Sequence, residues 1–296
     1  MIKLSVQVSY KKQATLGIIG IVILLLAIEA IANVWWITQI HCEFEQNEIF
    51  QNFDEVEKRQ LCLDFYNLKT SGDELIPNQS TDSITINTLG FRGAEFFTVK
   101  PLDTYRIFMV GGSTMFGAGA TSDKTTIPGY LQQLLNEKDF GFDIEVINSG
   151  IQGADSNTEL KFIEQKLVTF SPDLIIIYDG WNDLRANNAP MEVKENWETI
   201  CKFGKESDFD VIITLQPIAG FGNKVLTKQE LKYVHTGEDY AKNPLIESSS
   251  IYQDYAKNLS EIKTCTKTFD IRDVFDTETG PIYWDQGHVS DRGNSI

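Results

Sequence analysis

Five short apolar runs, separated by stretches of helical character, constrain the fold of this chain more than any other feature. Each run is rich in β-forming residues and does not alternate with polar ones, as expected for parallel strands that are covered on both faces. The predicted strands are Arg106–Val110, Ile144–Asn148, Leu174–Tyr178, Val211–Leu215 and Phe269–Val274. Strand–helix alternation with short loops predicts a doubly wound α/β sheet.

The predicted helices lie between these strands, at Ile127–Glu137, Ser156–Phe170, Glu192–Phe203 and Tyr252–Thr264. In the second of them, Leu160, Ile163 and Leu167 share one face, which is the spacing of an amphipathic helix. Residues 216–250 form a longer insert before the last helix.

The N-terminal part of the chain is apolar in a different way. Residues 14–37 are interrupted only by Glu29 and Asn33, and about 20 apolar residues span a bilayer core. We therefore predict a transmembrane helix over 14–37. Lysines precede it and acidic residues follow, so the positive-inside rule places residues 1–13 in the cytoplasm and the rest outside the cell, with Trp35 and Trp36 at the outer interface.

Two other interpretations of this stretch stay open. Ala30-Ile31-Ala32 has the form of a signal-peptidase site, which would give a secreted protein after cleavage. A buried helix of a soluble protein is the third possibility.

All four cysteines lie beyond the apolar stretch, and an even number in an exported chain suggests disulfides. We predict the pairs Cys42–Cys62 and Cys201–Cys265, although the sequence does not choose among the three possible pairings. Residues 38–84 are polar and carry two of the cysteines, and we interpret them as a stalk or small cap before a domain over 85–296.

The charge of the chain excludes one class of partner. Its 42 acidic residues against 26 basic ones give a formal net charge of −16. Nucleic-acid binding needs a basic face, so nucleic acid is not an expected partner.

Polar residues follow the predicted strands, at the edge where doubly wound sheets bind ligands. The loops are Gly111-Gly112-Ser113-Thr114, Ser149–Gly153 and Asp179–Asp183, and a fourth, Trp284–His288, follows the last strand after a short connection. Together they supply a hydroxyl, backbone amides, a carboxamide, and an imidazole with a carboxylate, which are the groups that acyl transfer needs. The loop around Ser113 does not match a P-loop, a dinucleotide-binding loop or a G-x-S-x-G elbow.

A general base needs a carboxylate that orients it. His288 has Asp285 three residues before it, whereas His41 borders the apolar stretch and His235 lies in the insert without such a neighbour. We therefore expect His288 to be the base, with His235 as the next candidate.

In this order the four loops resemble the blocks of the SGNH (GDSL-like) hydrolase superfamily: GGST, NSGIQG, DGWND and DQGH. The preceding INTLGFRG, residues 86–93, looks like the lead-in of exported members, and the resemblance covers 86–294. Gly112 and Thr114 stand where the name-giving motif has Asp and Leu. The resemblance implies a three-layer α/β/α sandwich with a five-stranded, flavodoxin-like parallel sheet.

The same resemblance implies the roles of the site residues. Ser113 would be the nucleophile, His288 the base and Asp285 its orienting group. The oxyanion would be held by the amides of Ser113 and Gly153 and the side chain of Asn182. No metal or cofactor is implied.

The implied activity is a serine-dependent hydrolysis of small acyl esters, acetyl esters above all, with surface carbohydrate as the expected substrate. Transfer of an acyl group to a surface polysaccharide and an inactive glycan-binding module are the alternatives. We expect Trp181, Asp183 and the insert to shape specificity, with residues 220–231 as a candidate lid. The end of the chain, SDRGNSI, is typical of the start of a closing helix capped by Ser290, and a truncated C-terminus is therefore one interpretation of the sequence.

Overall fold

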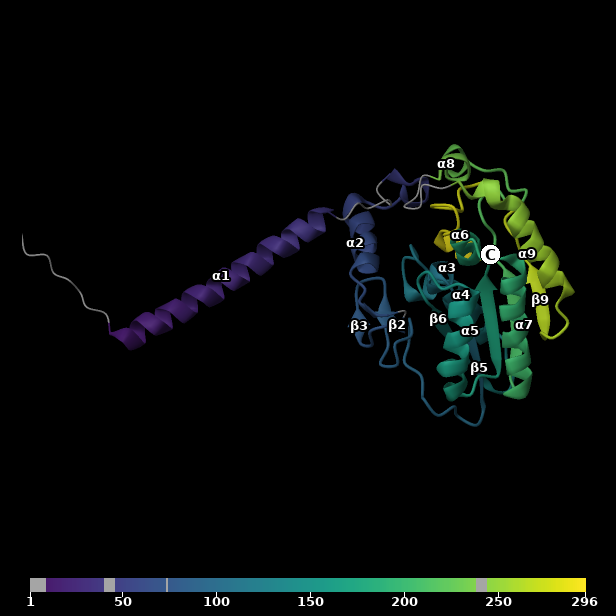
Figure 1. Ribbon diagram of the computed structural model, residues 1–296, viewed down its shortest axis with the longest axis horizontal. Helices are drawn as coiled ribbons and strands as arrows, with labels where there is room; N and C mark the ends of the chain where they lie inside the picture. Colours follow the sequence, from purple (N-terminus) through teal and green to yellow (C-terminus); the bar gives the residue numbers. More distant parts are fainter. Residues whose placement is uncertain (1–8, 40–45, 73, 238–243) are drawn as a thin grey trace, which may run out of the picture. The chain divides into compact units, whose positions relative to one another are not determined.

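The computed structural model of the chain describes residues 9–39, 46–72, 74–237 and 244–296. The chain divides into two compact units, residues 1–42 and residues 43–296 (Figure 1).

The described part of the first unit is the single helix α1 (Tyr10–Gln39). Its segment Tyr10–Trp35 has a mean hydropathy of 2.6 and is long and apolar enough to cross a membrane. Length and composition are the whole of this evidence, and a signal sequence near the N-terminus has the same properties.

The second unit is built on a five-stranded parallel sheet, as predicted. Its strands are β5 (Thr104–Gly111), β6 (Asp143–Gly150), β7 (Leu174–Asp179), β8 (Asp210–Leu215) and β9 (Lys267–Asp270). They are arranged in the order β6-β5-β7-β8-β9, and every neighbouring pair is parallel. Because β6 and β7 lie on opposite sides of β5, the chain changes direction across the sheet at β5, where doubly wound sheets bind their ligands.

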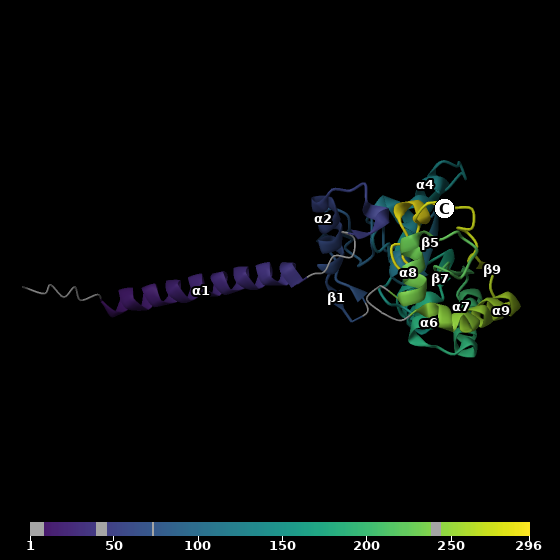
Figure 2. The same ribbon diagram turned by 90° about the horizontal axis from the view of Figure 1, so that it is seen from above.

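Helices cover both faces of the sheet, which confirms the three-layer architecture (Figures 1 and 2). On one face, Phe108 and Val110 of β5 pack with α5 (Ser156–Gln165), α7 (Pro190–Glu206) and α9 (Ser249–Glu261). On the other, Ile107 and Met109 pack with α4 (Ile127–Asn136). Neighbouring residues of one strand thus enter different cores, which is why the strand reads as continuously apolar in the sequence.

Two predicted elements have different limits in the structure. The helix expected over Ser156–Phe170 leaves helical geometry at Lys166 (φ −122°, ψ −58°) and continues as the 3₁₀ helix η4 (Leu167–Phe170). The last strand ends at Asp270 rather than Val274. The backbone and guanidinium of Arg272 both donate to the Asp270 carboxylate, and this local turn ends the strand.

Short elements complete the second unit. Before the sheet come η2 (Glu48–Phe50), α2 (Glu55–Tyr66) and the small strands β1 (Thr70–Ser71), β2 (Glu74–Leu75), β3 (Gln79–Ser80) and β4 (Thr85–Ile86). In the later loops lie α3 (Ser113–Phe116), η3 (Asp123–Thr125), α6 (Trp181–Ala186), α8 (Lys228–Thr236), η5 (Leu245–Ser248) and α10 (Asp291–Asn294).

The segment predicted as a stalk or cap makes specific contacts with the α/β fold where the structure describes it. Asn47 Nδ2 donates to the Tyr233 hydroxyl and to the Trp284 carbonyl, at 2.8 and 2.7 Å. The Glu48 backbone amide donates to Gln229 Oε1 at 2.7 Å. Within the segment, Asp64 accepts from the backbone and hydroxyl of Ser83. Residues 43–84 therefore belong to the same compact unit as the sheet; a domain boundary at residue 84 stays a prediction.

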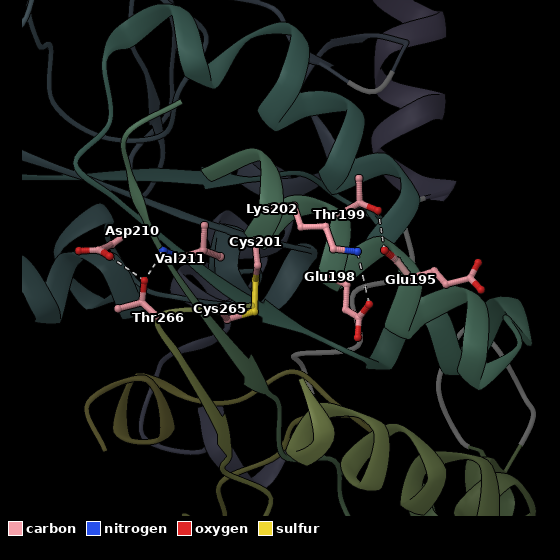
Figure 3. Close-up of a disulfide and its surroundings, with 9 residues drawn as sticks. All are labelled: Glu195, Glu198, Thr199, Cys201, Lys202, Asp210, Val211, Cys265 and Thr266. Carbon is pink, nitrogen blue, oxygen red and sulfur yellow. Dashed lines mark hydrogen bonds and ion pairs between the residues drawn. A yellow bond between two sulfur atoms is a disulfide. The ribbon is translucent and has the colours of Figure 1, made fainter. Parts of the chain in front are cut away.

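One predicted disulfide is confirmed. Cys201 of α7 is bonded to Cys265, just before β9, with their Cα atoms 4.7 Å apart (Figure 3). Next to it, Thr266 Oγ1 donates to Asp210 and accepts from the Val211 backbone, so β8 and the start of β9 are joined there as well. Cys62 is buried in α2, but Cys42 lies outside the described residues, so the pair Cys42–Cys62 stays a prediction.

Candidate active site

Ser113 is the first residue of α3, directly after β5. The turn leaves no room for a side chain at the preceding position, because a Cβ on Gly112 would lie 2.1 Å from Asn182 Nδ2. This close approach explains why glycine stands where the related motif has aspartate. It also brings the loops after β5 and β7 together.

His288 lies against Ser113 although 175 residues separate them in the chain. His288 Nε2 is 2.7 Å from Ser113 Oγ, and its Nδ1 is 2.5 Å from Asp285 Oδ2. The other oxygen of Asp285 accepts from the backbone amides of Gly287 and His288 at 2.9 and 2.7 Å. The D-x-x-H spacing thus makes a turn in which one carboxylate holds both the backbone and the imidazole ring.

Asn182 and Gly153 border the same cavity as Ser113. Asn182 Nδ2 donates to the Ala154 carbonyl at 2.7 Å, which leaves its second N–H for another acceptor. Gly153 has φ +76°, a conformation that favours glycine, and a Cβ there would meet no atom within 4 Å. The three residues predicted to hold an oxyanion therefore line one cavity, and their role as donors stays a prediction.

Two tryptophans fix the imidazole of His288. The Trp284 ring is stacked on it at 4.6 Å with 7° between the planes, and the Trp181 ring meets it edge-on at 4.7 Å. Neither packing partner was predicted from the sequence, although Trp284 directly precedes Asp285.

Trp181 and Asp183, predicted to shape specificity, are both buried, and neither borders the cavity at Ser113. Trp181 packs on the imidazole instead. The Asp183 carboxylate accepts from the backbone and hydroxyl of Ser156, at 3.0 and 2.7 Å, and so ties α6 to α5. The residues of α6 that do border the cavity are Asn182, Arg185 and Ala186.

Two further acids are buried beneath this loop. Burial raises the pKa of Glu159 well above its usual value, and the neighbouring Asp179 and Asp183 raise it further. Burial and the adjacent Asp183 likewise raise the pKa of Asp179, against the opposing hydrogen bond from Trp197. Among the described residues, neither carboxyl oxygen of Glu159 has a hydrogen-bond partner.

Arg92, in the segment INTLGFRG, holds the turn that follows the serine. Its buried guanidinium donates to the carbonyls of Phe116 and Gly117 at 3.0 and 2.8 Å, and it forms an ion pair with Asp123. Burial lowers its pKa, which the Asp123 carboxylate opposes. The position of Arg92 next to Phe91, in an otherwise uncharged segment, was the sequence signal for a buried structural arginine.

The insert also supports the site, in a way that the sequence did not indicate. Glu230 of α8 is fully buried; one carboxylate oxygen accepts from the backbone amides of Ile282 and Tyr283, and the other from Lys224 Nζ at 2.9 Å. The residues predicted as a lid (220–231) thus brace the loop that carries Asp285 (Figure 2). Closure over the site stays a prediction.

The other histidines lie elsewhere. His235 is on the exposed side of α8, and Ser113 Oγ is hydrogen-bonded to His288 instead. His41 lies outside the described residues.

A cavity of about 680 Å³ opens at Ser113. It is lined by Phe65, Tyr66, Ser113, Gln152, Gly153, Asp155, Asn182, Arg185 and Ala186. Its volume is within the range of small-molecule sites.

Solved structures that are similar to part of this chain include two acetyl esterases and an α/β hydrolase enzyme. A mutant of the acetyl-xylooligosaccharide esterase Axe2 from a Geobacillus species is 16% identical, with a TM-score of 0.46 over 64% of this chain and 89% of that chain. The acetyl xylan esterase AlAXEase is 18% identical, with a TM-score of 0.43 over 64% and 94%. LAE5, from the metagenome of Lake Arreo, is 12% identical, with a TM-score of 0.48 over 64% and 89%.

Among curated proteins, none matches this sequence significantly. The family comparison is informative, because residues 109–295 match the GDSL-like Lipase/Acylhydrolase family. That range is more than half of the chain and runs from β5 through α10, so it includes all four loops of the site. The chain therefore belongs to the GDSL-like lipase/acylhydrolase family and is a hydrolase that acts on esters.

Proposed function

We propose that the chain removes small acyl groups, acetyl above all, from carbohydrate outside the cell, with Ser113 as the nucleophile. The observation that carries this proposal is the continuous hydrogen-bonded line from Ser113 Oγ through the His288 ring to Asp285. Such a line is what a serine hydroxyl needs to act as a nucleophile near neutral pH.

In acylation, Ser113 Oγ attacks the ester carbonyl carbon while His288 Nε2 takes its proton. Asp285 keeps the Nδ1 proton directed at itself and stabilises the imidazolium. The stacked Trp284 ring adds a π face against that cation. The carbonyl oxygen becomes an oxyanion, which accepts from the amides of Ser113 and Gly153 and from Asn182 Nδ2; each such donor lowers the barrier by about 3 kcal/mol.

Collapse of this intermediate breaks the bond to the alcohol oxygen, which receives the proton from His288 Nε2. The acyl group is then an ester of Ser113. Deacylation repeats the steps with water: His288 takes a proton from water, the hydroxide adds to the carbonyl carbon, and Ser113 leaves with the proton returned to it.

The lining of the cavity combines polar and apolar side chains. Gln152, Asp155 and Arg185 stand beside two aromatic side chains. A long acyl chain is better served by a continuous apolar channel, whereas a small acyl group on a polar alcohol suits a mixed lining.

The test is hydrolysis of p-nitrophenyl acetate by the full chain in detergent, compared with the Ser113→Ala and His288→Ala variants. We expect both variants to lose at least about a thousandfold in kcat, and by similar factors, because the two residues act as one unit. Turnover that survives Ser113→Ala would contradict the proposal. Product analysis with an added glycan acceptor separates hydrolysis from transfer.

We further propose that α1 stays attached and anchors the chain, with the second unit outside the cell. The apolar span and the Cys201–Cys265 disulfide support this location. Mass spectrometry of the membrane fraction tests it. An intact N-terminus is expected, whereas a mature chain that begins after Ala32 would show a cleaved signal.

A further inference from the structure

We propose that Phe65 and Tyr66 of α2 form a platform on which the sugar ring of the ester's alcohol part packs. This inference rests on the proposed function and adds residues that lie outside the family match, which begins at residue 109. It assigns substrate selection to the segment that precedes the sheet.

The cavity at Ser113 has room for an occupant larger than the acyl group. An acetyl group fills only a small part of about 680 Å³, and an alcohol of one or more rings would fill much of the rest. Because Ser113, Gly153 and Asn182 line the same cavity as the two aromatics, a substrate placed at the nucleophile is also within reach of α2.

The aromatic pair has the character of a binding surface. Tyr66 is 49% exposed and lines the cavity at Ser113, so its ring has apolar area that a ligand in this cavity can cover. Phe65 meets Tyr66 edge-on at 5.9 Å and packs on Phe116 of α3 at 6.3 Å. Phe65 therefore couples the exposed ring to the short helix that begins with Ser113.

Polar groups in the rest of the cavity lining can form hydrogen bonds with the hydroxyls of a sugar. A pyranose has apolar C–H faces, which pack on aromatic rings, and a rim of hydroxyls, which need donors and acceptors. Gln152 and Arg185 supply donors, and Asp155 supplies a carboxylate. Despite its partial burial, Asp155 has a lowered pKa because of hydrogen bonds from Thr158 and Asn188, so it is ionised at neutral pH.

The platform is held in place by the same contacts that hold the nucleophile's turn. Asp64, next to Phe65, accepts from Ser83, and the Ser83 carbonyl accepts from Arg92 at 3.0 Å. Arg92 also binds the carbonyls at the end of α3. A preorganised ring needs no ordering when the substrate binds, which favours affinity.

The experiment compares two acetyl esters in the full chain: a monoacetylated methyl glucoside, which has a ring, and ethyl acetate, which has none. The variant is Tyr66→Ala. The matched control is Phe53→Ala, an aromatic just before α2 that borders a different cavity, with Val56 and Glu57. We expect Tyr66→Ala to raise KM for the glucoside about fivefold or more with little change in kcat, and to leave ethyl acetate hydrolysis unchanged. Phe53→Ala should change neither.

An equal loss on both esters would mean that Tyr66 is structural, and no loss on either would mean that the ring does not meet the substrate; both results overturn the inference. A separate readout covers the case in which the wild-type chain hydrolyses neither ester, which would contradict the proposed function. Saturation-transfer NMR of methyl glucoside with the Ser113→Ala variant should show contact with the aromatic protons, and that contact should be lost on adding Tyr66→Ala. Unchanged saturation transfer would overturn the platform by itself.

Discussion

At the residue scale, polar side chains of the site use their two polar atoms or two protons for different partners. Asp285 Oδ1 holds the backbone of its own turn, while Oδ2 holds the His288 ring. The Asn182 amide likewise donates one N–H to the Ala154 carbonyl, and its second N–H is the one proposed to bind the oxyanion. Preorganisation of this kind places the donors before charge develops on the substrate.

Replacing Asn182 by alanine should therefore reduce catalysis more than binding. We expect Asn182→Ala to lower kcat by roughly a hundredfold to a thousandfold with little change in KM, because the oxyanion exists only in the transition state. Steady-state kinetics on p-nitrophenyl acetate measures this, and thermal unfolding checks that loss of the bond to Ala154 has not unfolded the loop. A rise in KM at constant kcat would assign Asn182 to ground-state binding instead.

At the element scale, supports far from Ser113 in the chain determine where the histidine loop lies. Helix α8 positions Glu230 under the backbone of Ile282 and Tyr283, and Asn47 holds the Trp284 carbonyl. The Glu230–Lys224 pair is almost fully buried. Removing Lys224 leaves the buried Glu230 carboxylate with backbone amide donors but without a cation.

Lys224→Met should for this reason destabilise the fold by about 3–5 kcal/mol and also lower esterase activity. The control is Lys202→Met, which removes a half-exposed partner of Glu198 on α7 (Figure 3) and should change stability by less than about 0.5 kcal/mol. Urea unfolding of both variants makes the comparison. If both variants changed the free energy of unfolding by the same small amount, the buried Lys224–Glu230 pair would not stabilise the fold.

The Cys201–Cys265 bond joins α7 to β9 across 64 residues. Its loss releases a long loop in the unfolded chain, so Cys201→Ser with Cys265→Ser should reduce the free energy of unfolding by about 4 kcal/mol. Thermal unfolding of the double variant against the wild type tests this. An unchanged melting temperature would indicate that the unfolded chain is not constrained by the bond.

At the scale of the whole molecule, the interior contains carboxylic acids whose ionised form is destabilised by burial. Glu159 and Asp179 are buried on the core side of the site and have pKa values well above the ordinary range because of burial and neighbouring carboxylates. A raised pKa means that the folded chain binds more protons than the unfolded chain. Stability is then greatest below the unfolded pKa and decreases as the pH rises towards the folded pKa.

Glu159→Gln should prevent part of the loss of stability that the folded chain shows as the pH rises. From the ordinary glutamate pKa of 4.5 upward, we expect wild-type stability to decrease with pH more steeply than that of the variant, by at most about 1.4 kcal/mol per pH unit for this one group. Urea unfolding at several pH values between 5 and 8 checks the slope. Glu164→Gln, on the exposed side of the same helix, is the control and should leave the slope unchanged. Parallel curves for wild type and Glu159→Gln would contradict the raised pKa.

Local patterns in the sequence were sufficient for the fold and for the order of the loops. Continuous apolar runs specify strands buried on both faces, because each β5 residue enters one of two cores. The D-x-x-H turn is local as well, since Asp285 and His288 are joined through backbone bonds within four residues. Both features depend on neighbours in the chain, which a single sequence displays.

Contacts over long separations were decided only by the tertiary structure. The burial of Glu230, in the segment 220–231, under the histidine loop had no signal in the sequence, and a lid role for this segment stays a prediction. The packing of Trp181 on the His288 imidazole and the position of α2, in the predicted stalk, beside the cavity are likewise visible only in the structure. The physical reason is that burial and pairing of these side chains depend on which loops meet at one sheet edge, and no local periodicity encodes that meeting.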